Sequence, residues 1–272
     1  MIRVLFSSFL AASLMLSCSS QPKKEKGLDI DKISIVPLFE NQLPVTIIGG
    51  ATVTPPPVKK PKGKVIAKKA MRPTVLDDQN LFADVTAWNI NDYVTKTYAA
   101  EFTALDKKLV DVPLDAKMID AYRNEARGLK DIYLGDRWQN LTQYVLNEAD
   151  KQGALYVLMV HPYTVEGFGQ YKSGFGLFCP AQGRQMTALQ GYTSIRAQIY
   201  DVKARKVTAM ATITPVDVNF NTELGCDQAR KMTPDEIVAK YKEQILEMVK
   251  SSVETSLRQT GIKPVQLEQE HN

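Results

Sequence analysis

The sequence predicts an α+β fold, an α/β sandwich in which a mixed sheet of about four to five strands is packed by about four helices. Two periodicities support this prediction. Apolar residues alternate with polar ones in the stretches expected to form strands, and they recur at helical spacing in the stretches expected to form helices. The strands of the C-terminal half follow one another closely, which predicts a C-terminal antiparallel meander.

The N-terminal half is expected to begin with a strand. Residues Lys32–Phe39 alternate and then run apolar, as a strand does. Between Ala83 and Lys107 the apolar residues share one face of a predicted helix; they are Ala87, Ile90, Val94, Tyr98, Phe102 and Leu105. A short strand is expected at Leu109–Val112.

Two further helices are expected before the main strands. Asp115 can cap a helix that stops at Gly128, with an apolar face formed by Met118, Ile119, Tyr122 and Ala126. Asp136 can open another helix that Gly153 ends, with an apolar face formed by Trp138, Leu141, Val145 and Ala149.

The strongest strand signals follow these helices. Ala154–Val160 is continuously apolar, which is typical of a strand buried on both faces. Tyr192–Asp201 and Val207–Val216 alternate, and the short sequence between them predicts a hairpin. Thr233 and Glu236 have the spacing of a capping box, so a long helix is expected from there to about residue 259.

The segment Glu40–Pro73 follows neither periodicity. It combines consecutive prolines at Pro55–Pro57 with many basic residues, so it is expected to be an exposed loop within an insertion at 40–80. One hypothesis is a solvated insertion without a ligand. The other is an arm that contacts anionic lipid headgroups, a cell-wall polymer or an acidic partner, with Lys59, Lys60 and Lys62 as candidate partner-binding residues.

Composition and charge are those of a globular protein. The chain has 272 residues, of which 44% are hydrophobic and 24% charged, so it can form a large core and is not expected to be disordered. The formal net charge of +4 is modest, and part of it lies in the basic insertion. No basic face that would bind nucleic acid is therefore expected.

The first residues have the pattern of an export signal. Arg3 precedes an apolar run from Val4 to Leu16, and small Ser17 stands before Cys18. The run is shorter than the roughly 20 residues that cross a bilayer as a helix. A permanent membrane helix is therefore not expected.

The same residues resemble a bacterial lipoprotein signal. In such signals a cysteine after a small residue is acylated, for example with palmitate, and becomes the mature N-terminus. The resemblance implies a signal peptide at 1–17, lipid attachment at Cys18 and a tether at 18–28. Because Ser19 follows the cysteine, it also implies sorting to the outer membrane, facing the periplasm. The alternative is an ordinary secretory signal that contains Cys18.

The cysteine count predicts a disulfide. The chain has 3 cysteines, an odd number for an exported protein. If Cys18 carries lipid, Cys179 and Cys226 remain as a pair in an oxidising compartment. A bond between these two is expected.

The segment GFGQYKSGFGLFC, Gly167–Cys179, is rich in glycine and aromatic residues. A phosphate-binding loop needs lysine and a hydroxyl residue after its last glycine, but Phe175 and Gly176 follow Gly174. A loop that joins two strands is therefore favoured, with both cysteines of the pair on loops at one end of the sheet. The aromatic residues either pack beneath this loop or contact a partner, and as candidate partner-binding residues they are Phe168, Tyr171, Phe175 and Phe178.

The sequence predicts no catalytic or metal site. His161 lies in the best core strand and is expected to be structural, and no histidine or cysteine cluster has zinc spacing. Arg196, Gln198 and Tyr200 share one strand face, which is either a shallow polar site or a solvated surface. We therefore expect a protein that is not an enzyme and needs no cofactor.

The order of the elements resembles the anticodon-binding-domain-like fold of bacterial envelope lipoproteins. The residues that carry the resemblance are Ala149–Val160, where a helix end runs through Gly153 into an apolar strand, and Ile199–Asp201 with the basic turn Lys203–Lys206. Members include the curli secretion channel lipoprotein, the lipoprotein activator of penicillin-binding proteins and the N-terminal domain of the Tol-Pal translocation protein. The resemblance implies one such domain at 29–262, followed by a polar tail at 263–272.

This resemblance also implies a function. Such a protein would be a non-catalytic protein-binding or assembly module of the cell envelope, with an envelope protein as its partner. One alternative is a ring-forming subunit of a secretion channel or motility apparatus, which would form homo-oligomers. Another is a periplasmic enzyme whose site the sequence does not reveal.

Overall fold

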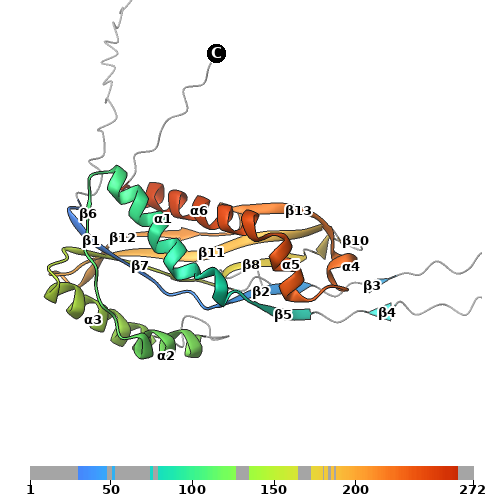
Figure 1. The fold of residues 1–272 in the computed structure, drawn as a ribbon, viewed down its shortest axis with the longest axis horizontal. Coiled ribbons are helices and arrows are strands. Elements are labelled where there is room, and N and C mark those ends of the chain that lie inside the picture. Colours follow the sequence, from blue (N-terminus) through green and yellow to red (C-terminus); the bar gives the residue numbers. More distant parts are fainter. Residues whose placement is uncertain are drawn as a thin grey trace, which may run out of the picture.

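The computed structural model describes residues 30–47, 51–52, 74–75, 79–126, 135–164, 173–179, 181–182, 185–186 and 188–262. Over these residues the fold is α+β, as predicted, with a large mixed sheet and helices packed on it (Figure 1). This part of the chain contains a sheet of nine strands and six α-helices, more than the sequence predicts.

The large sheet has the strand order β5–β2–β8–β11–β7–β1–β6, and β12 and β13 also pair with β11. The strand bounds are β1 Lys32–Pro37, β2 Gln42–Ile47, β5 Gln79–Asp84, β6 Lys108–Leu109, β7 Tyr156–Pro162, β8 Gly174–Cys179, β11 Ala188–Asp201, β12 Lys206–Ile213 and β13 Asn219–Gly225. Two short pairs lie outside it, β3 Ala51–Thr52 with β4 Thr74–Val75 and β9 Ala181–Gln182 with β10 Gln185–Met186.

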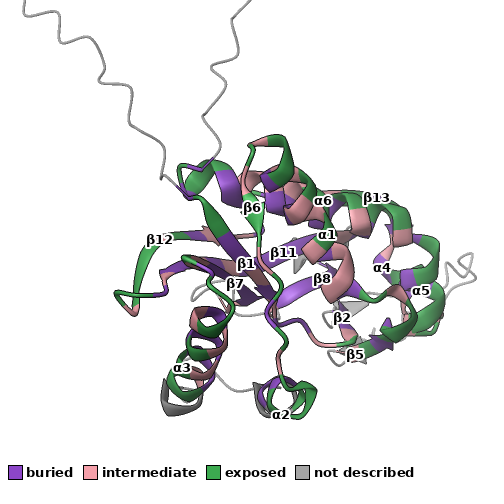
Figure 2. Ribbon diagram, turned by 60° about the vertical axis from the view of Figure 1, so that its left-hand side comes forward, coloured by how far each residue is buried: buried purple, intermediate pink, exposed green. Residues whose placement is uncertain are grey.

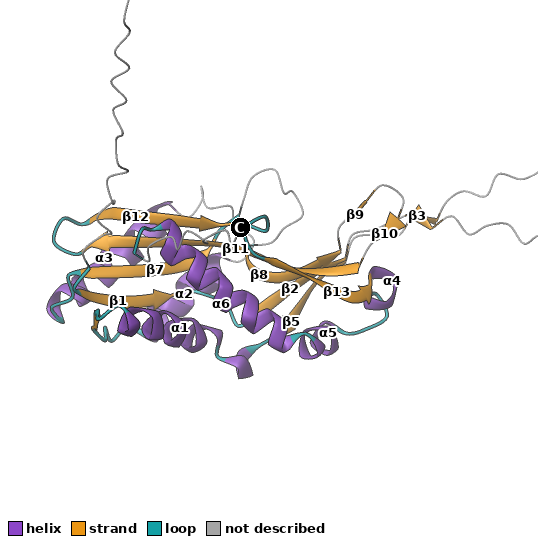
Figure 3. Ribbon diagram, turned by 90° about the horizontal axis from the view of Figure 1, so that it is seen from above, coloured by secondary structure: helices purple, strands orange, loops and turns teal. Residues whose placement is uncertain are grey.

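Strand β11 is the centre of the sheet. Its C-terminal half pairs antiparallel with β7 and β12, and its N-terminal half pairs antiparallel with β8 and β13. Figure 3 shows β12, β7 and β1 at one end and β13, β8 and β2 at the other, with β11 reaching both. The predicted meander β7–β11–β12 is confirmed, and β1 and β2 extend the sheet in parallel beside β7 and β8.

The predicted exposed insertion is wrong at both of its ends. Gln42–Ile47 forms the core strand β2 between β5 and β8, and residue 80 lies within β5. Because β2 is buried from Leu43 to Ile47, its residues do not alternate, and the usual strand period is absent. Pro44 is tolerated because it precedes the residues that pair with β8.

The last residues of the glycine-rich segment form a core strand where a loop is predicted. Gly174–Cys179 is β8, buried along its whole length between β2 and β11. Gly176 lies opposite Tyr192, and a Cβ atom on Gly176 would be 2.5 Å from the tyrosine ring. Gly191 likewise lies opposite Phe220, whose ring fills the space of a side chain. These glycines therefore make room for aromatic rings on neighbouring strands.

Replacing Gly176 with alanine should destabilise the protein by about 1 to 3 kcal/mol, because the added methyl group overlaps the buried Tyr192 ring. Urea unfolding followed by circular dichroism measures this change. Gly225→Ala is the matched control, since its Cβ would meet nothing within 4 Å, and it should cost nothing. Equal stability of both variants would show that the Tyr192 ring does not require the glycine.

Helices cover both faces of the sheet (Figure 2). One face carries α1 Ile90–Ala104, α5 Pro234–Lys240 and α6 Lys242–Gln259, and the other carries α2 Ala116–Ala126 and α3 Gly135–Lys151. Each face has its own buried cluster, and β11 contributes Ile199 to one and Tyr200 to the other. Alternate residues of this strand therefore pack into opposite cores.

The first and last predicted helices differ from those observed. Ala83 belongs to β5, and a 3-10 turn at Thr86–Trp88 precedes α1. The predicted long C-terminal helix is interrupted at Tyr241, which separates α5 from α6. The apolar face of the first helix is confirmed at Ile90, Val94, Tyr98 and Phe102, which are buried. Ala87 lies in the 3-10 turn and Leu105 follows the helix, so neither belongs to it.

The predicted capping box is confirmed at the start of α5. The Glu236 backbone N–H donates to the Thr233 hydroxyl over 3.3 Å, and the Thr233 backbone N–H donates to the Glu236 carboxylate over 2.8 Å. Two backbone donors at the helix start are thereby satisfied. This cap fixes where the chain enters α5 after the turn that follows α4 Cys226–Ala229.

Thr233→Ala should lower the free energy of unfolding by about 1 kcal/mol, because the N–H of Glu236 loses its acceptor. Chemical denaturation measures the loss. Thr103→Ala, at an exposed threonine near the end of α1, removes a hydroxyl without removing a cap. If both threonine variants lose the same stability, the cap is not the cause.

Candidate functional site

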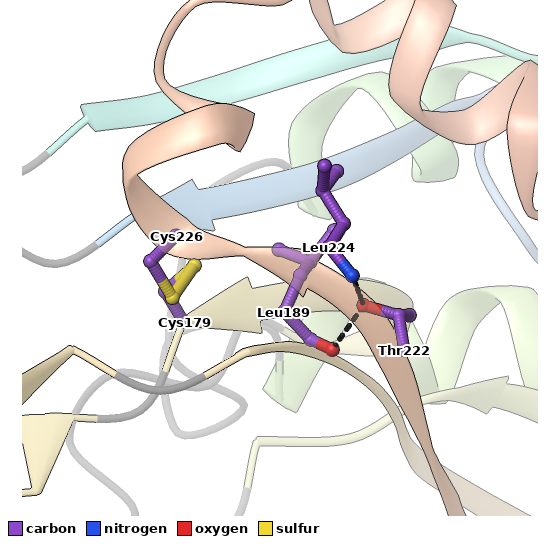
Figure 4. The surroundings of a disulfide bond; sticks show 5 residues. All are labelled: Cys179, Leu189, Thr222, Leu224 and Cys226. Atoms are coloured by element: carbon purple, nitrogen blue, oxygen red, sulfur yellow. Dashed lines mark hydrogen bonds between the residues drawn. A yellow bond between two sulfur atoms is a disulfide. The ribbon is translucent and has the colours of Figure 1, made fainter.

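The predicted cysteine pair lies at the end of the sheet that holds β8 and β13. The structure joins Cys179 and Cys226 in a disulfide with a Cα–Cα distance of 5.8 Å (Figure 4). The cysteines are not on loops as predicted, since Cys179 ends β8 and Cys226 begins α4. Both side chains are 1% exposed. The bond therefore ties the glycine-containing strand to the start of the C-terminal helices.

A buried hydroxyl supports the strands next to the disulfide. The Thr222 hydroxyl donates to the Leu189 carbonyl over 2.7 Å and accepts from the Leu224 N–H over 3.2 Å (Figure 4). The register between β11 and β13 shifts between Ala188 and Gln190. The Thr222 hydroxyl thus supplies hydrogen bonds where the regular ladder between the two strands is interrupted.

The two aromatic residues of β8 are buried in the core. Phe175 and Phe178 are buried, with the Phe175 ring 4.9 Å from Phe39 and the Phe178 ring 5.8 Å from Tyr192. They follow the packing alternative because both rings lie in the interior against aromatic side chains from other parts of the chain, which sequence alone does not show. The other predicted contact residues, Phe168, Tyr171, Lys59, Lys60 and Lys62, lie outside the described residues, as does Cys18.

His161 is held as a neutral structural group. Its Nδ1 lies 2.9 Å from the Pro162 carbonyl oxygen and its Nε2 lies 3.3 Å from the Gln198 side-chain oxygen. The Trp138 ring of α3 covers it at 4.3 Å. Burial lowers the pKa of His161 to about 4, although both hydrogen bonds act in the opposite direction. At neutral pH this histidine carries no charge and is a weak base.

The row Arg196, Gln198 and Tyr200 lies beside His161. The Tyr200 hydroxyl donates to the Gln198 side-chain oxygen over 3.3 Å, so Gln198 and Tyr200 join the histidine in one hydrogen-bonded group beneath α3. The Arg196 guanidinium stacks on the Tyr163 ring at 3.5 Å, and its Nε lies 3.5 Å from the Thr212 hydroxyl. Over the described residues this row is packed against protein and does not form a fully solvated face.

Among the described residues, the recorded hydrogen bonds of His161 go to Pro162 and Gln198 and not to a carboxylate. The described residues contain no group of three or more histidine, cysteine, aspartate or glutamate side chains that could hold a metal ion. Nor does the structure place a described carboxylate in an ion pair with Arg196. The arrangement fixes α3 on the sheet and leaves a stacked guanidinium at its border.

A groove between α1 and α2 is a second candidate site. Its volume is about 300 Å³, and it lies along the last residues of β1. Ile35, Pro37, Leu114 and Ile119 give it an apolar lining. The sequence alone does not reveal this groove, because its residues come from separate elements and share no motif.

The rim of the groove is acidic. Asp92 in the first turn of α1 and Asp120 in α2 line it from the two helices, and its lining includes no lysine or arginine among the described residues. Asp92 pairs with Lys96 at 2.7 Å, with the lysine side chain 76% exposed. An exposed pair of this kind holds the carboxylate only weakly. The groove therefore combines an apolar lining with a carboxylate, that of Asp92, which an exposed lysine holds weakly.

Comparisons with known proteins give only distant structural likenesses. No protein-family model matches the chain, and a search of curated proteins finds no match. The lipoprotein GNA1162 from Neisseria meningitidis is 10% identical with a TM-score of 0.31, over 80% of this chain and 97% of that one. The hypothetical protein CT253 from Chlamydia trachomatis is 9% identical with a TM-score of 0.32, over 83% of this chain and 98% of that one.

At these values the likenesses establish neither a family nor a function. The resemblance to the curli secretion channel lipoprotein, the penicillin-binding-protein activator and the Tol-Pal domain stays a prediction. Within the described residues, no helix has both the length and the apolar composition to cross a membrane.

Proposed function

We propose that the protein is a lipid-anchored binding or assembly module of the bacterial cell envelope, attached through Cys18 to the outer membrane and facing the periplasm. Its partner is an envelope protein, and its role is contact between proteins and not catalysis. The N-terminal sequence supports the anchor, with an apolar run that ends at Ser17 and Cys18. Acyl chains contribute about 0.8 kcal/mol of membrane affinity per buried methylene, so several of them anchor a protein firmly.

The disulfide is the observation that carries this proposal. Cys179 and Cys226 are joined across 47 residues in the interior. Structural disulfides form and persist in oxidising compartments such as the periplasm and are rare in the cytosol. With these two cysteines paired, Cys18 is the cysteine that remains for lipid.

The polar group beside α3 supports binding over chemistry. His161 has partners at both ring nitrogens and is covered by Trp138, so a substrate would have to displace α3 to reach it. Arg196 lies on Tyr163 and does not hold an acidic catalytic group among the described residues. Arginine and aromatic residues in such positions are common in protein–protein contacts.

The anchor is tested by mass spectrometry of the protein extracted from membranes. The mature chain should begin at Cys18 with an added acyl mass, and Cys18→Ala should abolish both the acyl mass and membrane retention. Cys179→Ala is the matched control and should leave acylation unchanged, because it removes a cysteine of the disulfide. An unmodified N-terminus in the wild-type protein would disprove the anchor.

A further inference from the structure

We infer that the outer edge of β12 binds an extended segment of a partner protein, in which an acidic residue lies among apolar ones and which adds as a further strand of the sheet. The inference deepens the proposed binding function by naming the surface and the chemistry of the partner. It rests on the proposed contact with another protein but not on the lipid anchor. The two can therefore fail separately.

Strand β12 lies at the border of the sheet, and among the described strands it pairs with β11 alone (Figure 3). The Ile199 carbonyl of β11 points toward β12, because it accepts a hydrogen bond from the Thr208 hydroxyl over 3.1 Å. The Ser194 carbonyl points the other way, because it accepts a hydrogen bond from the Tyr163 N–H, next to β7. The odd-numbered residues in this half of β11 therefore bond to β12, and the even-numbered residues bond to β7.

The register shows which backbone groups of β12 are open. Ala209, Ala211 and Ile213 lie opposite odd-numbered residues of β11, so their N–H and C=O groups point inward. Met210 and Thr212 alternate with them and direct their backbone groups outward, where no described strand pairs with them. An exposed edge of this kind can accept an added strand, because its backbone groups offer a ready hydrogen-bonding pattern.

This open edge, Met210–Thr212, has two defined ends. Before it the register shifts, so that Val207 lies opposite Tyr200 and Thr208 is an extra residue. After it the Thr214 N–H donates to the Asp217 carboxylate over 2.7 Å and is not available to a partner. Between these ends β12 has no charged residue and no proline, which are the residue types that usually prevent strand addition at an edge.

Two exposed apolar side chains accompany the open edge. Val207 and Met210 are 40% and 50% exposed. They lie opposite Tyr200 and Gln198, so they share the face of the sheet that carries the polar row. Alternate side chains of an added strand would cover this face, and apolar ones there would remove both exposed residues from water.

A cation lies behind the same surface. The Arg196 guanidinium stacks on Tyr163, and its Nε lies 3.5 Å from the Thr212 hydroxyl. No described carboxylate forms an ion pair with Arg196. A glutamate of the added strand opposite Thr212 would reach the guanidinium across the threonine. The segment that fits this edge therefore has an acidic residue two positions from an apolar one.

This chemistry favours a foreign segment over a second copy of the chain. Two β12 strands could pair edge to edge, but the charged residue that β12 itself carries is Lys206, so a second β12 would offer Arg196 no carboxylate. The edge is also held in place before binding, because Ala211 and Ile213 are buried in the core on the opposite face. A preformed edge loses little entropy when a segment binds.

The test is selection from a random heptapeptide library by phage display on the full-length protein in mild detergent. Selected peptides should carry a glutamate or aspartate two positions from an apolar residue. Met210→Lys, which places a charge on the open edge, should weaken binding of the selected peptides about 10-fold or more. Met118→Lys is the matched control, because Met118 is 40% exposed on α2, and it should bind them as the wild type does. Circular dichroism checks that both variants fold.

A double-mutant cycle tests the acidic residue. Changing the acid of a selected peptide to its amide should weaken binding to the wild type about 5-fold or more, because the charged contact is lost. The same change should have almost no effect on binding to Arg196→Gln, where the cation is already absent. Lys206→Gln is the control and should keep the full effect. Equal effects on the wild type and Arg196→Gln would overturn the contact with Arg196.

Amide hydrogen exchange tests whether the segment adds as a strand. A bound peptide should slow exchange of the Met210 and Thr212 N–H groups about 10-fold or more, because they gain backbone acceptors. The Ala211 N–H, which points toward β11, is the internal control and should not change.

Three results would overturn strand addition at β12: failure to select peptides, binding without protection of these amides, or equal binding by Met210→Lys. Self-association of the wild type that Met210→Lys abolishes would make a second copy the occupant and overturn a foreign partner. Cys18→Ala should bind the selected peptides as the wild type does, so this surface and the lipid anchor are tested separately.

Discussion

The double variant Cys179→Ala/Cys226→Ala should unfold with a free energy about 4 kcal/mol below that of the wild type. The two cysteines are 47 residues apart, and a crosslink that closes a loop of this length restricts the unfolded chain by about 4 kcal/mol in the chain-entropy model. The bond also ties the end of β8 to the start of α4. Urea denaturation under oxidising conditions measures the difference.

The effect of the bond can be separated from the effect of the side chains. Wild-type protein reduced while unfolded, and kept reduced during refolding, should lose nearly the same stability as the double variant. Cys18→Ala, which leaves the pair intact, should unfold like the wild type. A loss below about 1 kcal/mol in the double variant would show that the bond does not constrain the chain as the structure indicates.

The sequence predicts best the elements whose burial differs between their two faces. The C-terminal half of β11 alternates because Ile199 packs on one core and Tyr200 on the other, so its period is visible. The capping box at Thr233 is predictable because its contacts span one helical turn. Local chemistry decides both features.

The strands that the sequence does not reveal depend on neighbours far along the chain. Strand β2 has no period because both of its faces are buried, and it precedes a Pro/Lys-rich segment that resembles a loop. In β8, the Tyr192 ring occupies the space where a side chain of residue Gly176 would lie, so this position must be a glycine and the strand resembles a loop in composition. In β13 the buried position 222 is a threonine, bonded to Leu189. Only the tertiary pairing explains these residues.

The candidate sites divide in the same way. The number of cysteines in the sequence predicts the disulfide pair. The alternation of polar and apolar residues predicts the polar row of β11. The contact between this row and His161 depends on the register of β11 against β7, in which Arg196 lies opposite the histidine. The groove lies where β6 no longer pairs with β1. No residue pattern near Ile33 predicts that the pairing ends there.

His161 should make the protein lose stability as pH falls from about 6.5 to about 4. The unfolded histidine binds a proton with a pKa near 6.5, whereas burial lowers the folded pKa to about 4. Between these values the unfolded state binds more protons, so acid favours unfolding. The contribution is fully present above about pH 6.5, and its loss near pH 4 amounts to about 3 kcal/mol.

His161→Gln isolates this contribution. Glutamine does not titrate, so the unfolding free energy of the variant should fall by about 3 kcal/mol less than that of the wild type between pH 7 and about pH 4. A constant cost of the substitution cancels, because only the two pH profiles are compared. The carboxyl groups of Asp84, Asp150, Glu223 and Glu236, whose pKa values hydrogen bonds lower, begin to lose their contribution as pH falls through their ordinary values of 3.8 for Asp and 4.5 for Glu, and this loss is the same in both proteins.

The imidazole itself provides an independent measurement. Its NMR signals should stay those of a neutral ring between pH 8 and about pH 5, because burial beneath Trp138 lowers the pKa of His161 to about 4. A titration near pH 6.5 would mean that water reaches the ring and that α3 does not seal the polar group. The same result would also mean that a substrate could reach His161, and this histidine would again be a candidate catalytic base.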